Sequence, residues 1–432
     1  MSAVVEPGDA RLAVVGGGWA GLAAAVTARQ RGWRVSLCEM APHLGGRART
    51  VSHGGLQLDN GQHILVGAYA DTLALMRTVG VDPETVLLRL PLTLRTPDGA
   101  GLQLPTGPAV PAFVRGVLAW RDLPWLDRLG LLAVAARWRL SGFRCAPGTT
   151  VAQLARHCPR SAYTRLIEPL CVAALNTPAD QASAQVLLNV LRDALFGAPG
   201  ASDLLLPRAP LDALLPEAAG RWLHAHGVEV RLGHRVSRLE PDGPRWRVDG
   251  ELHDAVVLAC PPGEAGRLCD TVAPAWAARA RALAYQPIVT TWLRAPGARW
   301  PCPMLALHSD ATSPAQFGFD LGALGGPAGL YALVSSGAAA WVDAGADATR
   351  RAMLAQWQRE FPSAAHAPVE WVAQRTEKRA TFACTPGLDR PPAQVAPHLW
   401  AAGDHVAGPY PATLEGAVRA GMEAARQAVS GA

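Results

Sequence analysis

The stretch RLAVVGGGWAGLAAAVTARQRGWRVSLCE, residues 11–39, decides the fold of this chain. It opens with a short apolar run, Leu12 to Val15, which is typical of a buried strand. A glycine-rich turn follows, and an alanine-rich helix is then expected to about Arg31, where Gly32 ends it. Trp33 to Cys38 alternates between apolar and polar residues, as a second strand does. This order predicts the strand–helix–strand unit of a Rossmann-like α/β fold.

The turn between the first strand and the helix has the glycine spacing G-x-G-x-x-G. In such a turn the first glycine permits a tight bend, the second lets a pyrophosphate approach, and the third lets helix and strand pack closely. Free N–H groups at the helix start can bind phosphate, and an acid about 20 residues further on can bind ribose hydroxyls. We therefore predict a dinucleotide site that includes Gly16, Gly18, Trp19, Ala20, Gly21 and Glu39.

The composition excludes several classes of protein. With 432 residues the chain is longer than one hydrophobic core usually serves, so two domains are expected. Hydrophobic residues make up 50% and charged residues 17%, which excludes a disordered chain. The net charge of +5 is spread along the chain, so no nucleic-acid-binding face is predicted. The eight cysteines form no Cys-x-x-Cys pair, so we expect reduced thiols, no metal site and a cytoplasmic protein.

A second glycine pair follows the predicted ribose-binding acid. Residues 40–50 read MAPHLGGRART, in which Gly45 and Gly46 precede Arg47. This resembles the GG-R-x-x-T motif of the amine oxidase and phytoene desaturase flavoproteins. In that superfamily the loop lies along the diphosphate and the flavin, where glycine permits close approach and arginine offers planar donors. The resemblance implies that all three residues contact the cofactor.

The far end of the chain carries a matching motif. Residues 399–421 read LWAAGDHVAGPYPATLEGAVRAG and resemble the C-terminal FAD motif of the same superfamily. The resemblance implies that Gly403 and Asp404 meet the ribityl-phosphate region. It also implies that a helix starting near Ala412 and Thr413 points at the flavin, where the helix dipole would stabilise the negative charge of the reduced form. Two motifs at opposite ends of the chain favour FAD over NAD, and we predict FAD as the cofactor.

Polar residues interrupt an apolar stretch at residues 58–69, which read LDNGQHILVGAY. If the preceding loop holds the ADP half of FAD, this segment should lie against the isoalloxazine ring rather than in water. We therefore predict cofactor contacts for Asn60, Gly61 and Gln62. Asp59 and His63 are candidate proton donors for catalysis. Each could equally be a structural group that hydrogen-bonds the flavin or the backbone.

Three longer blocks resemble the hydroxysqualene dehydroxylase family, also called squalene-associated FAD-dependent desaturases. They are residues 59–80, 168–197 and 202–223. The resemblance runs from about Arg11 to Gly421. It implies an isoprenoid (triterpene) substrate and the reductive removal of the hydroxyl group of hydroxysqualene, which gives squalene for hopanoid biosynthesis.

The domain organisation is predicted to be interleaved. Residues 1–95, 206–275 and 391–432 form a discontinuous FAD-binding domain. Residues 96–205, a mostly helical insertion, and 276–390, which add a sheet that includes PIVTTWLRA, form an α+β substrate domain. Residues 227–262 alternate as strands and return the chain to the FAD domain. By resemblance, the backbone of Val236 meets the adenine.

Residues 112–144 mix tryptophan and arginine with leucine-rich helical stretches. This pattern is typical of a helix that docks at a membrane interface, here the inner face of the cytoplasmic membrane. An internal helix pair with a solvated arginine face explains the pattern equally well. No uninterrupted apolar run reaches the roughly 18 residues that span a bilayer, so any membrane contact is expected to be peripheral.

Other functions remain open at the level of sequence. One is a carotenoid or phytoene-type desaturase, and another is an amine oxidase, which would need an aromatic pair flanking the flavin; Tyr410 is one candidate. A third is a non-catalytic, FAD-stabilised lipid-binding scaffold. Lys378 is the only lysine, so Schiff-base chemistry would have to use it. No second dinucleotide motif is evident, so the sequence does not indicate the electron donor.

Overall fold

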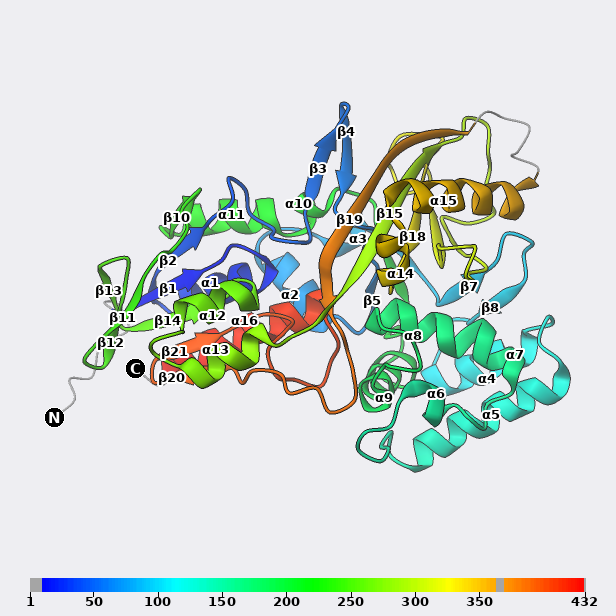
Figure 1. Ribbon diagram of the computed structural model, residues 1–432, viewed down its shortest axis with the longest axis horizontal. Helices are drawn as coiled ribbons and strands as arrows, with labels where there is room; N and C mark the ends of the chain where they lie inside the picture. The colour runs from blue at the N-terminus through cyan, green and yellow to red at the C-terminus, as the bar shows by residue number, and fades with distance from the viewer. Residues whose placement is uncertain (1–9, 363–368, 431–432) are drawn as a thin grey trace.

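The computed structural model describes residues 10–362 and 369–430, and its first part is a six-stranded sheet (Figure 1). The strand order is β10-β2-β1-β14-β21-β20, and only the β20–β21 pair is antiparallel. The strands are β1 (Arg11–Val15), β2 (Arg34–Glu39), β10 (Glu229–Leu232), β14 (Ala255–Leu258), β20 (Gln394–Ala396) and β21 (Leu399–Ala401). They come from three distant parts of the chain, and β1 lies near the middle.

Alternate side chains of β1 serve the two faces of this sheet, as the two-residue period of a strand requires. Leu12 and Val14 belong to a core with α1 (Trp19–Gln30), α11 (Pro216–Ala225) and α16 (Leu414–Ser430). Ala13 and Val15 belong to the core on the other face. That face is covered by α12 (Pro262–Leu268), α13 (Pro274–Arg281) and a small sheet of β11 (Leu239–Asp242), β12 (Arg245–Val248) and β13 (Glu251–His253).

The first and last helices touch through a glycine. A Cβ atom added to Gly421 in α16 would lie 2.1 Å from the carbonyl oxygen of Ala20 in α1. No side chain fits there, so the two backbones can approach only because residue 421 is glycine. The C-terminal helix is thereby held against the helix that follows the first glycine motif.

The second part is built on a five-stranded antiparallel sheet with the order β16-β17-β18-β15-β19. Its strands are β15 (Tyr285–Arg294), β16 (Met304–Ala306), β17 (Phe317–Asp320), β18 (Leu330–Ser335) and β19 (Glu370–Phe382). Met353 and Trp357 of α15 (Ala346–Glu360) pack on one face of it, beside α14 (Ala339–Ala344). The long strands β15 and β19 run from the far end of this sheet to the junction with the first part (Figure 1).

A helical lobe lies beneath this sheet in Figure 1. It comprises α4 (Ala109–Ala119), α5 (Trp125–Leu140), α6 (Val151–Leu154), α7 (Arg160–Ala162), α8 (Glu168–Leu175), α9 (Ala184–Val190) and the π-helical turns Tyr163–Ile167 and Leu191–Leu195. Trp120 and Trp138 are buried in its core with Phe113 and Phe143. Four of the five aromatic residues of segment 112–144 are therefore core residues, and only Trp125 is exposed.

Short elements connect the larger parts. Three small sheets pair β3 (Thr50–His53) with β4 (Leu56–Asp59), β5 (Leu65–Val66) and β6 (Leu87–Leu90) with β9 (Leu204–Pro207), and β7 (Thr93–Arg95) with β8 (Gly101–Gln103). The connecting helices are α2 (Ala70–Thr78), α3 (Pro83–Val86) and α10 (Leu211–Leu214).

The predicted α/β class is confirmed, and the expected strand, helix and strand are β1, α1 and β2, whose predicted ends lie within one residue of the observed ends. The strands expected in residues 227–262 are β10 to β14, and the strand expected in residues 287–295 is β15. Segment 96–205 is mostly helical, although it also contains β8 and the start of β9. Each of the three segments assigned to the FAD-binding domain supplies strands to the six-stranded sheet, while the domain boundaries themselves remain predictions.

Candidate active site

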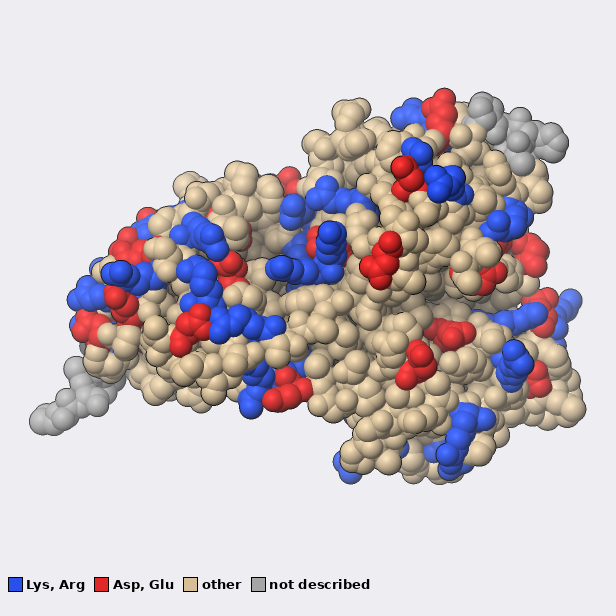
Figure 2. All heavy atoms as spheres, viewed as in Figure 1, with Lys and Arg blue, Asp and Glu red and all other residues tan. Residues whose placement is uncertain are grey.

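A cavity of about 650 Å³ lies at the junction of the two parts. One end is formed by the glycine turn after β1 and the end of β2, the middle by residues 45–49 and 60–64, and the other end by the helical lobe and β15. The surface is hollowed at this junction, and basic side chains border the hollow (Figure 2). Segments from both ends of the chain therefore meet around one space.

The glycines of the turn are required for different reasons. A Cβ at Gly16 would lie 2.5 Å from the carbonyl oxygen of Ala259, and a Cβ at Gly21 would lie 1.8 Å from that of Gly16, so packing demands both glycines. Gly18 has an ordinary extended backbone, and the nearest atom to its Cβ would be the Gly46 Cα at 3.8 Å. Protein packing does not explain Gly18. A ligand that approaches the backbone from the cavity does, as a dinucleotide pyrophosphate would.

Glu39 lies at the carboxyl end of β2 and lines the cavity. Its carboxylate accepts hydrogen bonds from the backbone N–H groups of Gly17 (2.6 Å) and Ala41 (2.7 Å). These bonds hold the side chain beside the glycine turn, and each carboxylate oxygen keeps a lone pair for a ribose hydroxyl. The geometry therefore fits the predicted ribose contact.

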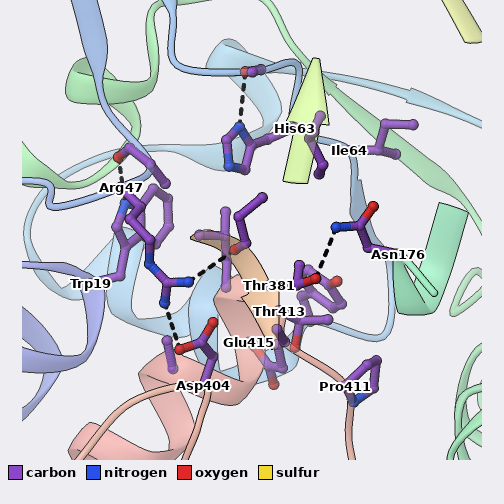
Figure 3. Close-up of a pocket in the computed structure, with 18 of the residues that line it drawn as sticks. Trp19, Arg47, His63, Ile64, Asn176, Thr381, Asp404, Pro411, Thr413 and Glu415 are labelled. Carbon is purple, nitrogen blue, oxygen red and sulfur yellow. Dashed lines mark hydrogen bonds and ion pairs between the residues drawn. The ribbon is translucent and has the colours of Figure 1, made fainter. Parts of the chain in front are cut away.

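Arg47 and Asp404 join the two cofactor motifs (Figure 3). The Arg47 Nη2 donates to the Asp404 Oδ1 at 2.6 Å, and its Nη1 donates to the Ala380 carbonyl of β19 at 2.9 Å. Burial alone would raise the pKa of Asp404, but the Arg47 guanidinium and the neighbouring His405 hold it well below its ordinary value. Both residues line the cavity, and Gly45, Gly46 and Gly403 lie beside them.

Asn60 fastens the loop after β4 to this junction. Its side-chain amide donates to the Arg47 carbonyl (2.8 Å) and to Glu377 (3.0 Å), and its oxygen accepts from Arg375 Nε (2.6 Å). Gly61 follows with φ of +92°, a conformation that favours glycine. Asn60, Gly61, Gln62 and His63 all line the cavity. The polar residues inside the apolar stretch thus face the cavity, as expected.

His63 points one ring nitrogen at the protein and the other at the cavity (Figure 3). Its Nδ1 lies 3.0 Å from the Gly61 carbonyl oxygen. Burial lowers the pKa of the ring; the Gly61 carbonyl opposes this shift, and Arg47 adds to it. His63 is therefore mostly neutral near pH 7, with a proton on Nδ1 and a lone pair on Nε2.

The prediction that Asp59 faces the cavity is wrong. Its Oδ1 accepts hydrogen bonds from the Thr50 hydroxyl (2.7 Å) and the Leu211 N–H (3.0 Å), and the residue does not line the cavity. The side chain alternation of β4 turns Asp59 towards α10 instead. Burial raises its pKa to about 6. Asp59 links the β3–β4 hairpin to α10 and is not placed to transfer a proton to a substrate.

The N-terminus of α16 faces the cavity through Ala412 and Thr413. The Thr413 hydroxyl accepts from the Gly416 N–H at 3.0 Å, which caps the helix. Glu415 lies at this helix start, and its carboxylate accepts from Thr72 N (2.9 Å) and Thr72 Oγ1 (2.7 Å), at the start of α2. The start of α16 therefore borders the cavity, which is the position that the predicted flavin contact requires.

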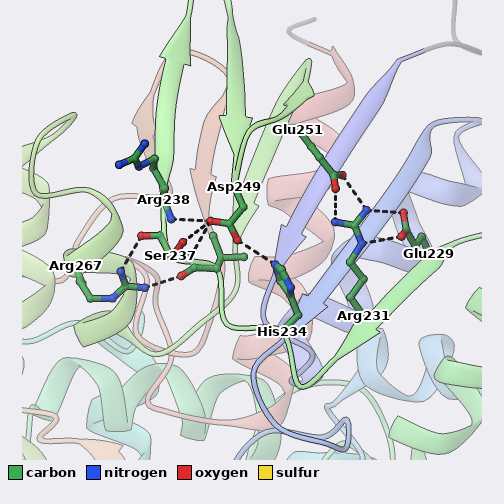
Figure 4. A network of polar contacts seen from close by, with 9 residues as sticks. Glu229, Arg231, His234, Ser237, Arg238, Asp249, Glu251 and Arg267 are labelled. Carbon is green, nitrogen blue, oxygen red and sulfur yellow. Dashed lines mark hydrogen bonds and ion pairs between the residues drawn. The ribbon is translucent and has the colours of Figure 1, made fainter.

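Val236 is held outside the cavity by the network in Figure 4. Its carbonyl oxygen accepts from Arg267 Nη2 at 2.7 Å, and its side chain is buried in the core behind β1. Asp249 anchors the next two residues through their N–H groups, Ser237 at 3.0 Å and Arg238 at 2.9 Å. The adenine contact of Val236 stays a prediction.

Arg390 is a residue that sequence motifs did not mark. Its guanidinium donates to the carbonyl groups of Asp404 (2.7 Å), Gly408 (3.0 Å) and Tyr410 (2.7 Å), and it lies 4.6 Å from the centre of the Phe382 ring. These bonds fix the loop between β21 and α16. Arg375 and Glu377 were also missed, because the sequence of a single strand does not show which loop it will face.

The cavity end away from the glycine turn is mostly apolar. Its walls include Leu92, Leu170, Leu191, Leu195, Ile288 and Phe317. Leu191 and Leu195 belong to a π-helical turn, and such turns are frequent at functional sites. The site therefore combines a polar half that fits a dinucleotide with an apolar half that fits a hydrocarbon.

Comparison with known proteins assigns the family. Residues 19–429 match the family described as flavin-containing amine oxidoreductase. The chain belongs to this family. A flavin-containing amine oxidoreductase binds a flavin cofactor, which confirms the cofactor prediction and agrees with the open backbone at Gly18.

Individual relatives match this chain over nearly their whole length. It is 30% identical over 445 residues to the hydroxysqualene dehydroxylase of Rhodopseudomonas palustris, covering 95% of this chain and 96% of the relative. It is 28% identical to that of Sinorhizobium fredii, covering 96% and 98%. An oxidoreductase from Methanosarcina mazei has the same fold, with a TM-score of 0.74, 17% identity, and 96% and 99% of the two chains covered.

Within residues 10–362 and 369–430, no helix is both long enough and apolar enough to cross a bilayer.

We predict that Gly18→Val abolishes flavin retention. The new side chain would occupy the space where the pyrophosphate approaches, while little protein lies near enough to clash. The measurement is the flavin absorbance per protein after purification, with Gly263→Val as control because a Cβ there meets no atom within 4 Å. Full flavin occupancy in Gly18→Val would contradict the assignment of the turn.

We predict that Asp59→Asn stabilises the protein at neutral pH. The carboxyl pKa of about 6 in the fold lies above the unfolded value of 3.8, so Asp59 destabilises the fold increasingly as pH rises through this window. Asparagine keeps the acceptor oxygen without the charge, and the gain at pH 7 should be at most roughly 3 kcal/mol. Unfolding free energies of both proteins between pH 4 and 7 test this; parallel curves would show that Asp59 does not titrate in this range.

Proposed function

We propose that the protein catalyses the reductive dehydroxylation of hydroxysqualene to squalene. Three curated relatives that cover at least 95% of this chain carry the name hydroxysqualene dehydroxylase. The structural observation that carries the proposal is the apolar end of the cavity, which continues directly from the polar half that fits the flavin. A triterpene alcohol has the matching character, since it is a long hydrocarbon with one hydroxyl group.

The proposed reaction replaces a C–O bond with a C–H bond. The hydroxyl group takes up a proton and leaves as water, and the carbon gains two electrons and a hydrogen. When bound, the reduced flavin supplies the hydride. The protein must supply the proton, hold the alcohol in place and exclude water from the reacting carbon.

His63 is the candidate for the proton transfer. Its Nε2 faces the cavity, while Nδ1 is held by the Gly61 carbonyl at 3.0 Å. In the protonated ring, Nδ1 would donate to this carbonyl and Nε2 to the leaving hydroxyl. The lowered pKa makes the protonated form a minority near pH 7 but also a stronger acid, which suits a poor leaving group.

The charged groups of the cavity disfavour an amine substrate. Its five carboxylates, on Glu39, Asp193, Glu377, Asp404 and Glu415, each already accept hydrogen bonds from protein groups. The Tyr410 hydroxyl is also engaged, since it donates to Asp193 at 2.7 Å. An ammonium group would therefore have to compete with these existing partners for a carboxylate, whereas a hydrocarbon needs none.

The decisive experiment is product analysis. We expect the purified protein, incubated with hydroxysqualene and a chemical flavin reductant, to form squalene detectable by mass spectrometry. Phytoene and a diamine are incubated in parallel with oxygen as acceptor. Turnover of phytoene would favour a desaturase, turnover of the amine an oxidase, and substrate binding without any flavin redox change a scaffold. Any of these without squalene would overturn the proposal.

We predict that His63→Ala keeps its flavin but loses squalene formation by roughly 10²-fold or more. The wild-type rate should rise as pH falls towards the lowered pKa of His63, because the protonated ring is the acid, and the variant should lose this dependence. His53→Ala, on the exposed β3–β4 hairpin, is the matched control. Near-normal squalene formation by His63→Ala would leave residues 60–63 as a flavin-contact loop only.

A further inference from the structure

Helix α5 is apolar on two faces. Its inner face packs Leu131, Val134, Ala135 and Trp138 into the core of the helical lobe. Its outer face carries exposed residues at alternating steps of three and four, which form a continuous stripe on a helix. The stripe consists of Leu126, Leu129, Ala133, Ala136 and Leu140. A helix that faced only water on this side would carry polar residues there.

The stripe belongs to a larger apolar surface. Leu126 and Leu140 are 77% and 88% exposed, and Trp125 at the start of α5 is 57% exposed. Of the eight large hydrophobic residues exposed in the described part of the chain, five lie between residues 118 and 140. We name the stripe together with Leu118 and Trp125 the docking face. The end of the molecule where Figure 1 shows α5 is mostly uncharged in Figure 2, with scattered basic side chains.

The charges beside the docking face are mainly positive. Arginines at positions 115, 121, 137, 139 and 144 are exposed. Asp122 and Asp127 are the only acids of segment 112–144, and both accept hydrogen bonds, from the Gly101 N–H and the Ser161 hydroxyl respectively. An apolar stripe with a basic rim complements an anionic bilayer surface, into which tryptophan and leucine insert while arginine binds the headgroups.

Aromatic side chains connect the cavity wall to the helices that carry the docking face. Leu195 lines the cavity, and the next residue, Phe196, lies 5.5 Å from Phe113 of α4 and 5.3 Å from Phe143 after α5, measured between ring centres. These rings connect the apolar wall of the cavity to the helices that carry the docking face.

We propose that the docking face seats the helical lobe on an anionic lipid bilayer, so that the apolar end of the cavity takes its substrate from the membrane. Binding of the docking face to lipid does not depend on the proposed function. Uptake of the substrate from the membrane does rest on it, so membrane binding is measured without substrate.

The experiment compares two matched double variants of the flavin-loaded protein by co-sedimentation with vesicles. Trp125→Ser with Leu126→Ser removes a tryptophan and a leucine from the docking face. Trp371→Ser with Leu232→Ser removes an exposed tryptophan and leucine elsewhere, 42% and 47% exposed. Vesicles contain either phosphatidylcholine alone or phosphatidylcholine with phosphatidylglycerol, each at low and high salt.

We expect the unmodified protein to bind the anionic vesicles more tightly at low salt. The docking-face variant should bind at least about tenfold more weakly, and the control variant should bind as the unmodified protein does. Replacing Arg137 and Arg139 by glutamine should weaken binding by roughly fivefold for each charge. Equal vesicle binding by the two double variants would overturn the proposal. It would also be overturned if the unmodified protein bound no vesicles and instead formed a dimer that Trp125→Ser dissociates. If the unmodified protein bound vesicles but formed no squalene, only the proposed function would be overturned, and the membrane-binding proposal would stand.

Discussion

The ion pair between Arg47 and Asp404 is the contact on which the site depends. It joins residues 357 positions apart, one from each cofactor motif. The same guanidinium reaches the backbone of β19, and the Arg47 carbonyl receives Asn60, so four segments converge on a single side chain and its peptide. Asp404 is buried, whereas the Arg47 side chain keeps 39% of its surface exposed, so removing Arg47 would leave the Asp404 charge inside the protein without its cation. The two parts of the molecule are therefore held in register at the cofactor site.

Two buried aspartates show how this junction controls protonation. Burial acts on both Asp59 and Asp404 and favours the neutral carboxyl group. At Asp404 the adjacent cation outweighs burial, so the group is ionised, whereas Asp59 has only neutral donors and its pKa rises to about 6. The cation also disfavours a proton on His63. One arginine thus lowers the pKa of both Asp404 and His63, whereas the pKa of Asp59 is governed by burial.

The sequence predicted those parts of the fold and site that depend on local pattern. Gly16 and Gly21 are dictated by contacts between neighbouring elements, and the turn around them could be read from spacing alone. Asp59 and Trp120 could not be placed from local pattern. The direction of Asp59 depends on α10, which covers one side of the short strand β4, and that of Trp120 depends on the core of the helical lobe. The hydrogen bonds of Arg390 go to backbone carbonyls of another segment, and no side-chain pattern in the sequence records such a contact.

The interleaved sheet has a consequence for synthesis of the chain. The central strand β1 pairs with β14, more than 200 residues later, and α1 packs against α16, which begins only at Leu414. Non-local pairings of this kind form slowly, because a long loop must close before they contribute stability. During translation the Arg47 loop therefore has no Asp404 partner until that residue has been made, and the apolar walls of the cavity stay uncovered until then. Capture of the flavin at the complete site must therefore follow synthesis of Asp404, and the uncovered apolar surface is most prone to aggregation before that step.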